Sequence, residues 1–353
     1  MQHARSSLKI RARDALKKWA LDLAAISGRY VPFSKSESEY QRAEPIAFRG
    51  DLPTSAGTEF NQYRLVYTQP RAPVLWANDI VYTPTGQAWI GSKLHRRFSI
   101  REPNLRDLRS PPPRDGLPCL EKATLLQCNL PYTYGDWVSE AALTLAGIEP
   151  DGSPLVLPEF LARKSYVRAD VKRLGFELVS AEAPLKVLQA RVARLTHPIN
   201  CIPVESVVQF RKRLSIRPPK PRAGSMIYLS RAGEASEVMA RQMPYDVIEP
   251  VLRKLGAQVI HCRDWRYDDY HRLASEAETV VADLGSATFN LVQWNSSRLV
   301  QLYSNSWWDG WGLFIAKAVG ITDISMVCVD GVDQATLERK LRELLQPADA
   351  IAS

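Results

Sequence analysis

The chain has 353 residues, enough for two domains, and its content of 45% hydrophobic and 24% charged residues is ordinary for a globular enzyme. A formal net charge of +8 indicates an anionic partner, for which a nucleotide, a nucleic acid and an acidic membrane face are the candidates. The five cysteines are odd in number and form no CxxC pair, which argues against a disulfide framework or a zinc cluster and favours a reducing compartment. No apolar run reaches the roughly 18 residues of a membrane-spanning helix, so we expect a cytoplasmic protein.

Residues 8–26 have the periodicity of an amphipathic helix. The apolar face consists of Leu8, Ala12, Ala15, Leu16, Trp19 and Leu23, and the basic face of Lys9, Arg13, Lys17 and Lys18. Two placements fit this pattern. The helix either lies peripherally on the anionic inner face of the cytoplasmic membrane, or packs on its own domain with the basic face in solvent.

The next hundred residues contain few regular patterns. Residues 34–57 are polar and predict a loop, and the Pro- and Arg-rich residues 103–118 predict an irregular surface connection. Between them, alternating hydrophobicity predicts a meander of strands at residues 64–67, 79–82 and 88–91, with a turn at 83–86.

The rest of the first half alternates between strand and helix patterns, which gives it an α/β character. The predicted strands are residues 123–130, 155–157, 176–179 and 189–195, and the predicted helices are residues 137–146, 160–174 and 204–214. The sequence IRPPKPRAG, residues 216–224, has three prolines and predicts a stiff, solvated linker. We therefore place one domain at residues 1–215 and a second at 225–353.

The second domain alternates strictly between strands and helices. Strands are predicted at residues 226–229, 257–261, 279–282, 298–303 and 324–329, and helices at 245–255, 270–278, 289–294, 313–318 and 333–345. Pro250 is expected to mark the start of the regular part of its helix. This order is typical of a parallel sheet covered on both faces, which binds ligands at the carboxyl ends of its strands. We expect residues 230–231, 283–288 and 304–308 to lie at that edge.

The residues themselves resemble a known family. The segments IYLSRAG, LGAQVIHCRDW, LASEAETVVADLGSATFNLVQW and RLVQLY, in this order and spacing, resemble the C-terminal half of glycosyltransferase family 61, and TYGDWVSE resembles the Asn-Tyr-Tyr-His-Trp-x-x-Glu signature of its N-terminal half. The resemblance covers about two-thirds of the chain. It implies a GT-B architecture, in which two Rossmann-like domains face across a cleft, and metal-independent, inverting sugar transfer from a nucleotide donor.

The resemblance also implies a donor-binding set. Its members follow the first and third strands of the second domain or, for Gln301, lie within the fourth: Ser230, Arg231, Gly285, Ser286, Ala287, Thr288, Asn290 and Gln301. A nucleotide diphosphate leaving group needs positive charge and backbone amides, which Arg231 and the turn at residues 285–287 could supply. A surface ion pair for Arg231 and an ordinary strand-to-helix turn at Gly285 fit the local pattern as well.

Inverting transfer needs a general base beside the acceptor hydroxyl. Asp136 stands where the family has its histidine, and Glu140 matches the family's acidic residue one helical turn later. Asp136 is the expected base, with Glu140 orienting it or binding sugar; an N-cap role for Asp136 at the following helix is an equal alternative.

Three residues depart from the family pattern. Leu284 replaces a common histidine, Gln301 replaces the glutamate expected on ribose hydroxyls, and Asp136 replaces the histidine base. His261 and His271, with three aspartates between them, fit no zinc spacing and predict a solvated loop.

The leading hypothesis is a hexosyl- or pentosyltransferase that uses a nucleotide sugar, with a uridine diphosphate sugar favoured. Its acceptor would be a glycan or lipid-linked glycan of a bacterial capsule or lipopolysaccharide, and it would need no metal or cofactor. The alternative is a non-catalytic GT-B homologue that serves as a scaffold or regulator in glycan assembly. Binding to nucleic acid rests on charge alone and is not expected, because the basic residues are dispersed.

Overall fold

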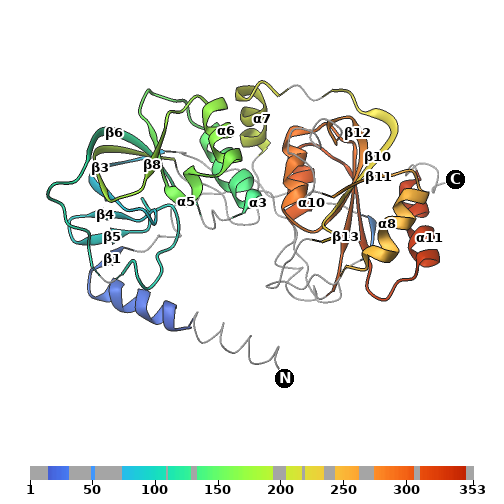
Figure 1. Cartoon of the computed structure of the whole chain (residues 1–353), viewed down its shortest axis with the longest axis horizontal. Coiled ribbons are helices and arrows are strands. Elements are labelled where there is room, and N and C mark those ends of the chain that lie inside the picture. Colours follow the sequence, from blue (N-terminus) through green and yellow to red (C-terminus); the bar gives the residue numbers. More distant parts are fainter. Residues whose placement is uncertain are drawn as a thin grey trace. The chain divides into compact units, whose positions relative to one another are not determined.

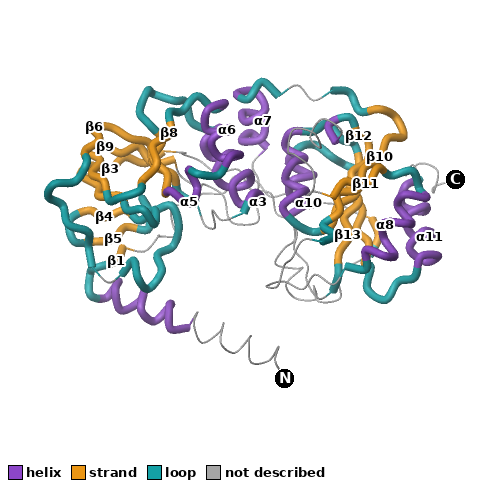
Figure 2. The backbone as a smooth tube through the Cα atoms, viewed as in Figure 1, coloured by secondary structure: helices purple, strands orange, loops and turns teal. Residues whose placement is uncertain are grey.

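The computed structural model describes residues 15–31, 49–51, 74–108, 110–128, 133–193, 204–216, 219–233, 243–261, 274–305 and 311–346. The chain divides into two compact units, of which unit 1 comprises residues 1–39 and 70–196, and unit 2 residues 40–69 and 197–353. Unit 2 therefore begins before the predicted linker, and Arg222, at the end of that linker, already opens a strand. Each unit has its own sheet, which confirms a mixed α/β fold (Figure 2).

Unit 1 contains an eight-stranded mixed sheet in the order β1-β5-β4-β3-β9-β6-β7-β8. The strands are β1 (Tyr30–Val31), β3 (Val74–Tyr82), β4 (Ala88–Ile90), β5 (Lys93–His95), β6 (Cys119–Leu126), β7 (Leu155–Pro158), β8 (Leu178–Ala181) and β9 (Leu185–Ala193). β3 and β4 correspond to two of the three strands of the predicted meander, and β5, which was not predicted, pairs antiparallel with β4. β9, β6, β7 and β8 are parallel to one another. The strand expected at residues 64–67 lies outside the described residues.

The two predicted helices between β6 and β8 are each divided into shorter helical segments. The predicted helix 137–146 is a composite of α3 (Tyr134–Asp136), the π-helix η3 (Trp137–Ala142) and α4 (Leu143–Ala146). The predicted helix 160–174 is two helices, α5 (Glu159–Ala162) and α6 (Ser165–Arg173), separated at Arg163 and Lys164. A further helix, whose described part is residues 15–26, precedes β1 and is called the N-terminal helix below (Figure 1).

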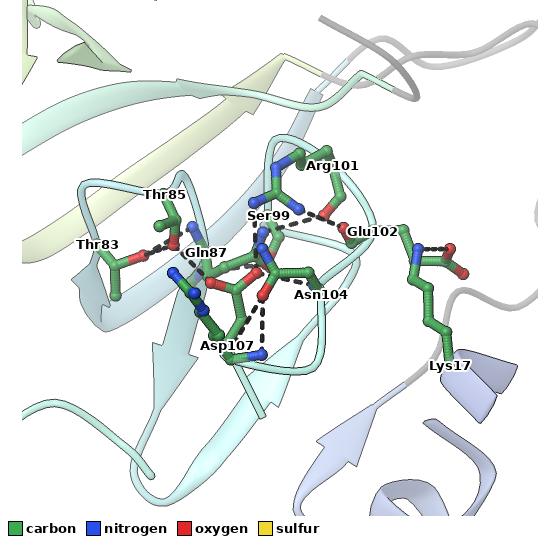
Figure 3. A network of polar contacts seen from close by, with 11 residues as sticks. Lys17, Thr83, Thr85, Gln87, Ser99, Arg101, Glu102, Asn104 and Asp107 are labelled. Atoms are coloured by element: carbon green, nitrogen blue, oxygen red, sulfur yellow. Dashed lines mark hydrogen bonds and ion pairs between the residues drawn. The ribbon is translucent and has the colours of Figure 1, made fainter. Parts of the chain in front are cut away.

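A polar network holds residues 99–107 against the turn between β3 and β4 (Figure 3). Only residues 103–107 of this segment belong to the stretch 103–118 that was predicted to be irregular. At its centre, one Asp107 carboxylate oxygen accepts from Thr85 Oγ1 at 2.8 Å, and the other accepts from Asn104 N at 2.8 Å and pairs with Arg101 at 3.4 Å. At its margin, Lys17 of the N-terminal helix pairs with Glu102 at 2.8 Å. The network therefore connects that helix to the loop.

Unit 2 contains a parallel sheet in the order β11-β10-β12-β13-β14-β2. Its strands are β2 (Arg49–Gly50), β10 (Arg222–Ser230), β11 (Gln258–His261), β12 (Ala277–Asp283), β13 (Arg298–Tyr303) and β14 (Asp323–Cys328). Five of the six were predicted within a few residues, whereas β2 lies in a stretch predicted to be a loop. β2 has only two residues, and it is recognisable as a strand through its pairing with Ser325 and Met326 of β14.

Helices cover both faces of this sheet, as Figure 1 shows. One face carries α8 (Tyr245–Lys254) and α11 (Gln334–Leu345), and the other carries α10 (Trp311–Ala318) and the 3₁₀ helix η4 (Ser286–Gln293). α7 (Val204–Arg213) also belongs to this unit. The predicted helix at 270–278 is partly outside the described residues, and its last two positions, Ala277 and Glu278, are in β12 instead.

Pro250 lies inside α8 rather than at its start. Because proline has no backbone N–H, the carbonyl four residues earlier loses its helical donor. In this structure that carbonyl, of Asp246, accepts from Gln334 Nε2 of α11 at 3.3 Å. The neighbouring helix thus supplies the missing hydrogen bond.

Candidate functional site

The carboxyl ends of β10 and β12 form the candidate binding edge of unit 2. The two strands are neighbours, and Leu229 is in register with Ala282. The segments that follow them, residues 231–233 and 284–288, therefore leave the sheet beside each other. Sequence reasoning predicted this proximity from the strand order.

A buried carboxylate joins the two strand ends. Asp283, only 2% exposed, accepts from Tyr228 Oη at 2.7 Å and from the backbone N–H of Arg231 at 3.2 Å. Burial of the carboxyl group raises the pKa of Asp283 to about 6, although both hydrogen bonds act to lower it. Asp283 therefore fixes where the chain turns after β10.

The Arg231 side chain reaches the segment that follows β12. Its Nη1 donates to the backbone carbonyl of Leu284 at 3.3 Å, and the side chain is half-buried. Arg231 and the 285–287 turn, which the sequence assigned to one site, are thus brought together by the fold.

Gly285 has φ 147° and ψ −171°, a conformation available almost only to glycine. η4 begins directly after it, and among the described residues the backbone N–H groups of Ser286 and Ala287 donate to no protein acceptor. Both residues are partly exposed. The turn therefore presents two amide donors and the positive end of a short helix to an anion.

Thr288 and Asn290, both predicted to touch the donor, are fully buried. Thr288 Oγ1 donates to the Gly285 carbonyl at 2.5 Å, and Asn290 Nδ2 donates to the Ala287 carbonyl at 2.9 Å. In this arrangement their side chains stabilise the turn from within.

Ser230 points to the α8 face of the sheet. Its Oγ donates to Glu249 Oε1 at 2.9 Å, and the same oxygen lies 2.8 Å from His261 Nε2. Partial burial acts to raise the pKa of Glu249, but the hydrogen bonds from Ser230 and His261 outweigh it and lower the pKa. The Ser230 hydroxyl is thus hydrogen-bonded to a side chain of α8. His261 was expected in a solvated loop, but it is the last residue of β11 and contacts the same glutamate.

Gln301 lies on the opposite face of the sheet, under α10. It is fully buried, and within the described part of the chain neither its Oε1 nor its Nε2 has a hydrogen-bond partner. The backbone of Gly312 on α10 packs against it so closely that a Cβ at that position would lie 2.3 Å from Nε2. Its amide therefore faces a helix backbone.

The two expected catalytic residues are in unit 1. Thr133 is the N-cap of α3, and Asp136 is the third residue of that helix, so the two form a capping box. Asp136 Oδ2 accepts from Thr133 N at 2.9 Å and from Thr133 Oγ1 at 2.8 Å. The N-cap role predicted for Asp136 at residue 137 is wrong, because Asp136 makes no side-chain cap bond to η3 and is instead the third residue of α3, whose N-cap is Thr133. The Asp136 carboxylate stays partly exposed.

Glu140 is 2% exposed and lies within the π-helix η3, a rare element that often occurs at functional sites. A buried cation, Arg96, is near it and donates to the backbone carbonyls of Ser99 and Cys128 at 3.1 and 2.8 Å. Burial lowers the pKa of Arg96, and the charge of Glu140 is among the influences that oppose this. Arg96 is a residue that sequence reasoning missed.

Sequence reasoning also missed Tyr228 and Glu249 as partners of the binding edge. It placed Asp283 at this edge without its bond to Tyr228, and it placed His261 in a loop rather than beside Glu249. For Tyr228, the sequence did contain a signal, because alternate side chains of a strand point to the same face of the sheet. Tyr228 and Ser230 are two apart in β10, so their side chains share one sheet face.

Within the described ranges, no group of three or more His, Cys, Asp or Glu side chains is placed to hold a metal ion. None of the described helices is long and apolar enough to cross a lipid bilayer. In comparisons with known proteins, the chain matches no family model and no curated protein sequence.

Proposed function

We propose that this protein is an inverting, metal-independent glycosyltransferase of the GT-B class, which transfers a hexose or pentose from a nucleotide sugar to a glycan or lipid-linked acceptor. The observation that carries the proposal is the meeting of Arg231 with the Gly285 turn at the carboxyl edge of a parallel sheet. The order and spacing of the motifs that resemble glycosyltransferase family 61 support the same reading.

The chemistry of the reaction explains why these groups would be useful. The bond between sugar and phosphate breaks as negative charge develops on a nucleoside diphosphate, so donors placed in advance at its oxygens lower the barrier. Arg231 offers a planar guanidinium that suits phosphate oxygens, and the Ser286 and Ala287 amides offer two donors that need no reorganisation. A uridine diphosphate sugar is the donor that we favour.

Thermal unfolding with added uridine, guanosine or cytidine diphosphate tests the donor site, because a ligand that binds only the folded state raises Tm. We expect one diphosphate to raise the Tm of the wild type, and Arg231→Gln to remove most of that rise. Arg339→Gln is the matched control, because Arg339 is an exposed α11 residue whose only described ion pair is with Glu343. No rise with any diphosphate, or equal rises in both variants, would count against the donor site.

Asp136 is the proposed general base. Its carboxylate could accept the proton of an acceptor hydroxyl while remaining the capping partner of Thr133, because a carboxylate has about four acceptor positions. Asp136→Asn should abolish turnover and retain donor binding. Thr133→Val, which removes the hydroxyl of the same capping box, should reduce stability but leave the base in place. If Asp136→Asn and Thr133→Val lost turnover equally, Asp136 would act only through the capping box and not as the base.

The alternative is a non-catalytic homologue that acts as a scaffold in glycan assembly. Three placements favour it: Asp136 is engaged in a capping box, Glu140 is buried, and Gln301 faces the backbone of α10. Donor binding without transfer to any glycan acceptor, together with unchanged biological function of Asp136→Asn, would favour the scaffold.

A further inference from the structure

The N-terminal helix turns its most apolar side away from unit 1. Eight large hydrophobic side chains are exposed among the described residues, and four of them lie on this helix: Leu16, Trp19, Leu23 and Ile26. Their exposed fractions are 52%, 61%, 45% and 83%. Because they are spaced by three or four residues, they form one continuous row, called the apolar stripe below.

The other side of the helix already has its packing partners. Leu21 is buried in a cluster with Tyr30, Val81, Trp89 and Leu94, and Ala24 and Ala25 pack against that cluster. Lys17 on the same side forms its ion pair with Glu102. The contacts that hold the helix to unit 1 therefore do not involve the apolar stripe. The sequence allowed a helix whose apolar face packs on its own domain, but Leu16, Trp19, Leu23 and Ile26 do not pack in this way.

The charges around the stripe are mainly positive. Lys18 of the helix, Arg29 just after it and Lys93 of β5 are exposed. The exposed acids on or beside the helix are Asp22 and Glu102, and the charge of Glu102 is balanced by its ion pair with Lys17. Arg29 and β5 lie together, because the Leu94 N–H donates to the Arg29 carbonyl at 2.8 Å. An anionic partner therefore suits the surroundings of the stripe, as does the net charge of +8 for the chain.

The small size of the apolar stripe favours a membrane over another protein as its partner. A stable protein interface uses roughly 20 to 30 residues from each side, many more than four side chains. A helix with Leu, Ile and Trp on one face and cations beside it has the composition that inserts into the headgroup region of a bilayer. We propose that the apolar stripe docks this protein peripherally on an anionic membrane surface.

Co-sedimentation of the full chain with vesicles tests the docking. The wild type should bind vesicles of phosphatidylcholine mixed with phosphatidylglycerol, bind phosphatidylcholine vesicles more weakly, and lose affinity as salt is added. Trp19→Ser should lower the partition coefficient for the anionic vesicles about tenfold or more, because it removes one large anchoring side chain. Lys18→Glu should lower it roughly tenfold as well.

Two matched controls make the result specific. Trp76 on β3 is also 61% exposed, so Trp76→Ser should leave vesicle binding unchanged. Lys172 is an exposed lysine on α6 of the same unit, and Lys172→Glu is the control for charge. Three results would overturn the proposal: a wild type that stays in the supernatant, a Trp76→Ser variant that loses as much binding as Trp19→Ser, or a dimer in analytical ultracentrifugation that Trp19→Ser dissociates.

Discussion

Replacing Asp283 by asparagine should change how the stability of this protein depends on pH. Asp283 is 2% exposed and accepts hydrogen bonds from Tyr228 and from the Arg231 N–H. Asparagine keeps one carbonyl oxygen as an acceptor and carries no charge at any pH. The comparison therefore isolates the cost of ionising a buried carboxyl group.

The size of the effect follows from the pKa. Burial raises the pKa of Asp283 from 3.8 to about 6 in the folded protein. Below pH 3.8 the carboxyl is protonated in both the folded and the unfolded chain, and its contribution to stability is fully present. As pH rises through about 6, the folded protein must ionise it in a buried site, and that contribution is lost. At about 1.4 kcal/mol for each pH unit between 3.8 and 6, the loss is about 3 kcal/mol.

Urea unfolding of the wild type and Asp283→Asn from about pH 3 to about pH 8 measures this difference directly. The free energy of unfolding of the wild type, relative to the variant, should fall by about 3 kcal/mol from the acid to the neutral end, since other titrating groups are common to both proteins. Tyr228→Phe removes a hydrogen bond that lowers the pKa, so the fall should move to higher pH. A difference that stays constant across this range would show that Asp283 is not ionised at a cost, and the reasoning would fail.

Three further substitutions test the packing around the site through the free energy of unfolding measured in urea. Gln301→Met removes two buried polar atoms that have no partners among the described residues, so it should add roughly 1–3 kcal/mol to the free energy of unfolding. Donor affinity should stay unchanged. A loss of affinity would show that Gln301 contacts the donor after all. Gly312→Ala should lower the free energy of unfolding by about 1–3 kcal/mol, because the new Cβ would clash with the Gln301 amide. The same substitution should cost less in a protein that already carries Gln301→Ala. Equal losses with and without Gln301→Ala would contradict this explanation. Arg211→Gln should cost about 1.5–3 kcal/mol, since the guanidinium donates to the Val292, Leu291 and Trp294 carbonyls at the end of η4; an unchanged midpoint would show that η4 does not depend on it.

Five of the six strands of unit 2 could be predicted because each is a short apolar run bounded by polar or turn-forming residues, whereas the two-residue β2 has no such pattern. β13 has the predicted bounds, Arg298–Tyr303. The helices of unit 1 were harder, because hydrophobic periodicity continues across breaks that the backbone makes. The predicted helix at 160–174 is interrupted at Lys164, whose extended backbone (φ −73°, ψ 129°) separates α5 from α6.

The binding edge was predictable only in part. Arg231 and Gly285 were found because each follows a strand that the order of elements places at the same edge of a parallel sheet. Their supporting partners come from residues far apart in sequence, so no local pattern shows them. Glu249 is 19 positions from Ser230, and Asp283 is 55 positions from Tyr228.

At this edge, the residues that we propose to bind a ligand and the residues that support them differ by only one or two positions along the chain. Ser230 is the last residue of β10, and its side chain bonds to α8, whereas the next residue, Arg231, extends its side chain to the segment after β12. Asp283 ends β12 in the same way and holds Tyr228 and the Arg231 backbone, whereas Gly285, two positions later, opens the turn. Residues within the strands therefore determine where the loops begin, whereas Arg231 and Gly285, just beyond the strands, are partly exposed. An anion that bound Arg231 and the Ser286 amide would consequently meet two loops whose positions are already set by one buried carboxylate.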